Sequence, residues 1–139
     1  MPFVRSSLSF AAIVGALSLF GCATTSGNLT HSAERLEHST ATLRDDAHRD
    51  SDSSGYTRDA QALAQEARDF RRVVEDHHAR DTDVRDAFED LSKSYHAMRD
   101  EVEHSRDRDA ERDFKPVTEA YLDVEREMRG YRRDRYAGD

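Results

Sequence analysis

The chain has 139 residues, with 21 basic and 29 acidic side chains and a formal net charge of −8. This is the length of a single domain, and so acidic a surface is a poor partner for nucleic acid or anionic lipid. A single cysteine excludes an intramolecular disulfide, so stability must come from the packing of apolar residues.

The first 21 residues have the three-part layout of a secretory leader. Arg5 provides positive charge, residues 8–20 (LSFAAIVGALSLF) form an apolar run, and Gly21 and Cys22 close it. The run of 13 residues is too short for a comfortable transmembrane helix, which needs about 20 residues. We therefore expect residues 1–21 to be a signal peptide.

The end of this leader resembles the lipobox of bacterial lipoproteins, which reads Leu, a small residue, Gly or Ala, and then Cys. Leu19, Gly21 and Cys22 match that pattern, whereas Phe20 stands where the family usually has Ala, Ser, Thr or Val. The resemblance implies cleavage between Gly21 and Cys22 by signal peptidase II, a diacylglycerol thioether on Cys22, and an acylated new amino terminus. It also implies lipid anchoring in the bacterial envelope. In that family a residue other than Asp after the cysteine, here Ala23, favours the outer membrane, facing the periplasm.

Two other interpretations of the leader stay open. Ordinary secretory cleavage after Ala23 would remove Cys22, and an uncleaved leader would itself act as an anchor. A lone cysteine at the end of the leader favours lipidation over both. Cleavage before Cys22 leaves 118 residues with 20 basic and 29 acidic side chains, a formal charge of −9.

Residues 22–28 are expected to form a lipidated polar tether, and residues 29–130 a helical domain. Apolar residues at alternating steps of three and four predict a first helix from about residue 28–30 to 49 and a second from about 57 to 78. A turn-rich stretch, 50–55, separates them. The apolar stripe of the first helix consists of Leu29, Ala33, Leu36, Thr40, Leu43 and Ala47. Because these residues are small and sparse, we expect this helix to lie loosely against a tighter three-helix unit.

The stripe of the second helix consists of Ala60, Leu63, Ala64, Ala67, Phe70, Val73, Val74 and His77. Its alanines predict close approach of a neighbouring helix. A third helix is predicted from about residue 83 to 104, with Asp81 or Thr82 as its N-cap. Its stripe consists of Val84, Phe88, Leu91, Tyr95, Met98 and Val102.

A fourth helix is predicted from about residue 110 to 129, with a stripe of Ala110, Phe114, Val117, Tyr121, Val124 and Met128. Pro116 allows two interpretations of its start. A helix beginning at Asp113 would place the proline in the first turn, where a missing donor matters little, whereas the upstream spacing favours a longer helix kinked by the proline. Gly130 is expected to end the helix, leaving residues 131–139 as a charged tail.

Short links between four similar segments predict an all-α fold, an antiparallel up-down four-helix bundle behind a cleaved leader. A long coiled coil is the rival architecture, because the stripes are close to heptad spacing. The breaks at 50–55 and 79–82 favour the bundle.

The candidate binding residues are histidines and methionines. None of the seven histidines forms a His-x-x-x-His pair, so we expect solvated histidines and no metal site. No Cys-x-x-Cys-His motif for haem attachment is present; Met98, Met128 and His77 are the available ligands for non-covalent haem, and packing is the more common role of such methionines. We therefore expect no cofactor.

Catalytic motifs are absent from the sequence, which contains no glycine-rich phosphate loop and no nucleophile elbow. We expect a non-enzymatic envelope protein with a structural or protein-binding role and an envelope protein as its partner. A metal- or haem-sequestering bundle is the alternative. Self-association stays open.

Overall fold

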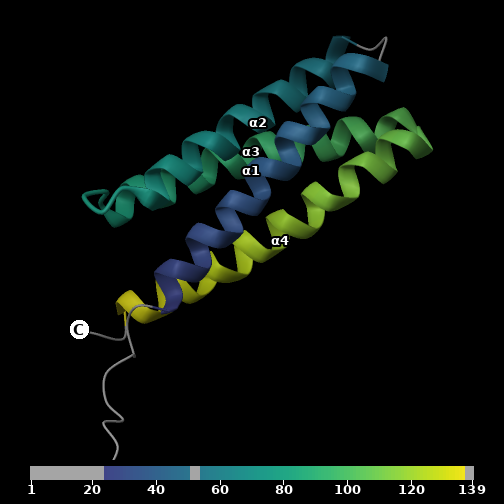
Figure 1. Cartoon of the computed structure of the whole chain (residues 1–139). Helices are drawn as coiled ribbons and strands as arrows, with labels where there is room; N and C mark the ends of the chain where they lie inside the picture. Colours follow the sequence, from purple (N-terminus) through teal and green to yellow (C-terminus); the bar gives the residue numbers. More distant parts are fainter. Residues whose placement is uncertain (1–23, 51–53, 137–139) are drawn as a thin grey trace, which may run out of the picture.

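A computed structural model describes residues 24–50 and 54–136, with side chains described for residues 27–49 and 55–132. Within this part of the chain the structure contains four helices: α1 (Thr24–Asp50), α2 (Ser54–Glu75), α3 (Asp81–Ser105) and α4 (Arg108–Tyr136). Consecutive helices run in opposite directions (Figure 1) and pack around one hydrophobic core. The predicted all-α bundle is confirmed, and the rival continuous rod does not form.

The first helix is an integral member of the bundle. α1 packs closely against both α2 and α4, and α2 also packs against α3. Of the helix pairs that are in contact, α3 and α4 are the least closely packed. No residue of the predicted α1 stripe is more than 2% exposed. The expectation that this helix lies loosely was wrong, because its small side chains let two neighbouring helices approach closely and bury the stripe from both sides.

Aromatic side chains fill the wider space between α3 and α4. The rings of Tyr95 and Tyr121 are stacked, with centroids 3.8 Å apart, and Phe88 and Phe114 lie on either side of this pair. The hydroxyl of Tyr121 donates to Ser92 Oγ at 2.9 Å. Rings of this size hold two helix backbones apart while still excluding water, which explains the sparse backbone contact between α3 and α4.

The helix α2 ends earlier than the spacing predicts. Asp76 turns the chain, because its carboxylate accepts a hydrogen bond from the backbone amide of His78 at 2.9 Å and its carbonyl accepts one from Ala79 at 3.0 Å. Aspartate commonly forms such turns in competition with helix. His77, predicted to belong to the core stripe, therefore lies exposed in the turn.

The start of α3 is capped by a residue other than the two expected. Arg80 is the N-cap, and its backbone amide donates to the Asp83 carboxylate at 2.9 Å. The Arg80 guanidinium also pairs with Asp83 at 2.8 Å, and these hydrogen bonds hold the pKa of Asp83 below its usual value. The predicted caps, Asp81 and Thr82, are already helical.

Two residues, Arg106 and Asp107, join α3 to α4. Arg106 adopts a left-handed conformation with φ 53°, which ends α3 in the usual way. The Asp107 carboxylate then accepts from the backbone amide of Asp109 at 2.9 Å and so caps α4. α4 begins at Arg108 and continues through the exposed Pro116. The predicted helix that begins upstream of Asp113 is therefore correct, and the predicted start at Asp113 was wrong.

The predicted stop at Gly130 was wrong, because α4 continues to Tyr136. Gly130 has no positive φ, and a Cβ built there would meet nothing within 4 Å.

We therefore expect Gly130→Ala to raise the free energy of unfolding by about 0.4–1 kcal/mol, because alanine loses less backbone entropy on folding. Urea unfolding followed by circular dichroism measures this. A loss of stability would show that the glycine is required in α4.

Candidate functional site

The predicted lipobox residues Leu19, Phe20, Gly21 and Cys22 lie outside the described residues. α1 begins at Thr24, two residues after Cys22, so Thr24–Asn28 of the expected tether are helical. The first turns of α1 lie at the same end of the bundle as the last turns of α4 (Figure 1). The end of α1 that is nearest to Cys22 in the sequence therefore lies at this end of the bundle.

A hollow of about 550 Å³ lies at the same end of the bundle. Its apolar walls come from three helices and a turn: Leu29 of α1, Val73 and Val74 of α2, Ala79 of the α2–α3 turn, and Val84 of α3. Leu29 and Val84 are buried, and the other three are half-buried. In Figure 1, α1 and α4 separate from the α2–α3 pair toward this end, so the helices leave space that these side chains line but do not fill.

Tyr131 of α4 borders the hollow from the fourth helix. Its hydroxyl donates to the Asp81 carboxylate at 2.7 Å, which ties the end of α4 to the first residue of α3. Sequence analysis assigned Tyr131 to a charged tail, yet it is half-buried against the core. The signal that could have found it is its place three residues after the core residue Met128, on the same helix face.

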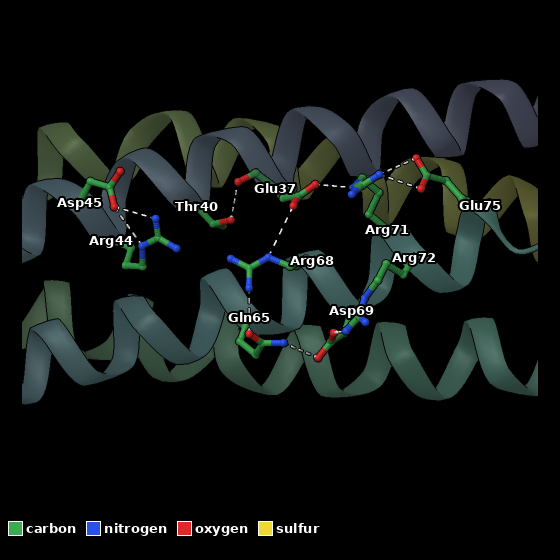
Figure 2. A network of polar contacts seen from close by, with 10 residues as sticks. All are labelled: Glu37, Thr40, Arg44, Asp45, Gln65, Arg68, Asp69, Arg71, Arg72 and Glu75. Atoms are coloured by element: carbon green, nitrogen blue, oxygen red, sulfur yellow. Dashed lines mark hydrogen bonds and ion pairs between the residues drawn. The ribbon is translucent and has the colours of Figure 1, made fainter.

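Two acidic residues also line the hollow: Glu75, the last residue of α2, and Asp76, which follows it. Arg71 pairs with Glu75 at 2.7 Å and also with Glu37 of α1, as Figure 2 shows. Hydrogen bonds from Arg71 to Glu75 and to Glu37 hold the pKa of Arg71 above its usual value. This network fastens α1 to α2 beside the hollow.

The candidate metal and haem ligands do not converge. All seven histidines, His31, His38, His48, His77, His78, His96 and His104, are exposed. Across residues 24–50 and 54–136, no group of three or more His, Cys, Asp or Glu side chains is placed to hold a metal ion. Met98 and Met128 are buried in the core, as expected of packing residues, whereas His77 lies in the exposed turn.

Tyr56, at the start of α2, has a pKa well above its usual value. Burial, together with the negative charges of Asp113, Asp107 and Asp46, raises its pKa to about 12. An unfolded tyrosine has a pKa of about 10. Above that pH the unfolded chain loses a proton that the folded chain keeps, so the contribution of Tyr56 is intact below pH 10 and is lost as the pH rises toward 12.

We therefore expect the free energy of unfolding to fall by up to about 3 kcal/mol through Tyr56 between about pH 10 and 12. Urea unfolding at a series of pH values measures the fall. Tyr56→Phe should remove this part of it, because phenylalanine does not titrate. If the free energy of unfolding fell equally with pH in the wild type and in Tyr56→Phe, the assignment to Tyr56 would be contradicted.

In comparisons with known proteins, no family model, no curated protein and no solved structure matches the chain. No helix among the described residues is long and apolar enough to cross a membrane. The fold and composition define the class of the protein, a small acidic four-helix bundle. Its function must be argued from its own residues.

Proposed function

We propose that the protein is a lipoprotein of the bacterial cell envelope, anchored through Cys22, with a non-enzymatic structural or protein-binding bundle. The observation that carries this proposal is the position of Cys22. It closes an apolar leader that matches a lipobox at Leu19 and Gly21, and it stands two residues before α1. Several acyl chains give stable anchoring, at about 0.8 kcal/mol per buried methylene.

Because only Ala23 separates Cys22 from α1, the bundle would begin at the membrane surface, and the length of α1 would set how far it reaches from the membrane. α1 has 27 residues, which corresponds to about 40 Å at 1.5 Å per residue. The end that contains the hollow would lie next to the lipid. The far end, where Tyr56, Asp107 and Asp113 lie close enough to interact electrostatically, would face a protein partner in the periplasm.

Metabolic labelling with a palmitate analogue tests the proposal. In bacteria that express the full chain, we expect label on the wild-type protein and recovery with the membranes. Cys22→Ala should lose the label, because no thiol remains to form the thioether. Inhibition of signal peptidase II should make the uncleaved precursor accumulate. An unlabelled wild-type protein would refute lipidation.

Two further variants serve as matched controls. Phe20→Ala restores the small residue usual in the family at that place and should be labelled at least as well as the wild type. Ala23→Asp should keep the label but move the protein toward the inner membrane, because the lipobox resemblance implies that Asp after the cysteine favours that membrane. Membrane fractionation separates these outcomes from simple loss of expression.

A further inference from the structure

We infer that the hollow at the end of the bundle holds one of the acyl chains attached to Cys22, an inference that rests on the proposed lipidation. The first argument is distance. Gly27, which lines the hollow, lies three residues into α1, or about 4.5 Å along its axis. The two residue steps from Cys22 to Thr24 add at most about 7 Å. An acyl chain spans one leaflet, about 15 Å, or half the hydrocarbon core, so it is long enough to enter the hollow.

The second argument is the chemistry of the walls. Leu29, Val74 and Val84 present aliphatic side chains to the hollow, and the acidic residues of its lining, Glu75 and Asp76, are neighbours at one place, where α2 ends. The volume of about 550 Å³ falls within the range of roughly 300–1,000 Å³ typical of sites for small ligands. An aliphatic chain would take from water the apolar surface that the diverging helices leave half-covered at Val73 and Val74.

The third argument is charge. Glu75 and Asp76 line the hollow, and the Arg71 guanidinium is already shared between Glu75 and Glu37. These carboxylates repel the carboxylate of a free fatty acid and the phosphate of a phospholipid. An acyl chain linked to the protein through an ester or amide carries no such charge, so the protein's own chain fits this site better than a free anionic lipid.

Photocrosslinking in the full-length protein tests this inference. Bacteria that express the wild-type chain are grown with a fatty acid carrying a diazirine and an alkyne, irradiated, and the purified protein is digested for mass spectrometry. We expect the chain on Cys22 to form intramolecular adducts on the peptides that contain Val73–Val84 and Tyr131. Labelled protein with adducts to membrane lipid but none on these peptides would overturn the inference while leaving the lipidation proposal intact. Absence of label on Cys22 would refute the lipidation proposal itself.

Two tryptophan variants provide a matched pair. Ala79→Trp places a large side chain in the wall of the hollow and should reduce the intramolecular adducts at least tenfold. Leu122→Trp, on α4 where Leu122 is 47% exposed, should leave them unchanged. Circular dichroism melting confirms that both variants fold. Equal adduct yields in the two folded variants would overturn the inference.

A last experiment distinguishes the acyl chain attached to Cys22 from a free lipid. The Cys22→Ala protein, produced without its leader and mixed with the free diazirine fatty acid, should give no adducts on these peptides. Adducts at wild-type yield in this experiment would show that the hollow takes free lipid, and would overturn the assignment to the chain on Cys22.

Discussion

Replacing Leu36 with alanine should lower the free energy of unfolding by about 2–5 kcal/mol. Leu36 is 0% exposed in the middle of α1, and α1 packs against both α2 and α4. The substitution removes apolar contacts with these neighbours and leaves a cavity that close-packed helices cannot fill. Small domains are stable by only about 5–15 kcal/mol, so the loss is a large part of the total. Urea unfolding of the leader-free Cys22→Ala chain measures it.

Leu122→Ala is the matched control for this measurement, because it removes the same atoms from an exposed position on α4. We expect it to change the free energy of unfolding by no more than about 0.5 kcal/mol. If Leu36→Ala were as mild as Leu122→Ala, α1 would be a peripheral helix, as its small side chains first suggested.

The contrast between these two leucines shows how far the sequence predicts the fold. Periodicity correctly assigned Leu36 to the core stripe of the first helix, because the burial of one helix face repeats every 3.6 residues. Leu122, which does not belong to the stripe of the fourth helix, is exposed. Periodicity says nothing about how many neighbours a face has. The small residues Ala33 and Ala47 indicate a weak helix if side-chain area alone is considered, yet they permit the close approach that makes α1 central.

Helix ends were predicted less well than helix faces. Gly130 is a frequent terminator, but its preference is worth about 1 kcal/mol or less, and packing of Tyr131 against the core carries α4 past it. Asp76 has the opposite effect, because its local hydrogen bonds end α2 before His77. Both outcomes depend on competition between local preferences and contacts with other helices, and spacing along one helix does not reveal which one prevails.

The parts of the candidate site also differ in whether the sequence alone predicts them. Cys22 is recognised from neighbouring residues in the sequence, because leader cleavage and lipidation act on a local motif. The hollow is formed by side chains from all four helices and a turn, among them Leu29, Val84 and Tyr131. Cavities that depend on how helices diverge at one end require the three-dimensional arrangement.

The second substitution for which we expect a large loss of stability removes one of the stacked rings between α3 and α4. We expect Tyr121→Ala to lower the free energy of unfolding by about 3–5 kcal/mol, because the Tyr121 ring stacks on Tyr95 and Phe88 where the two backbones have little direct contact. Its loss leaves a space that the separated helices do not close. Urea unfolding of the leader-free Cys22→Ala chain measures the change.

Tyr121→Phe distinguishes the ring from its hydroxyl group. It keeps the stack and removes one hydrogen bond, the donation to Ser92 Oγ at 2.9 Å, so we expect a loss of only about 1 kcal/mol. Ser92 Oγ keeps its own bond to the Phe88 carbonyl at 2.7 Å, which limits the cost of the missing partner. If the phenylalanine variant were as unstable as the alanine variant, the hydroxyl network rather than the rings would hold α3 to α4. A small loss in both would mean that α1 and α2 fix the positions of α3 and α4 without the aromatic layer.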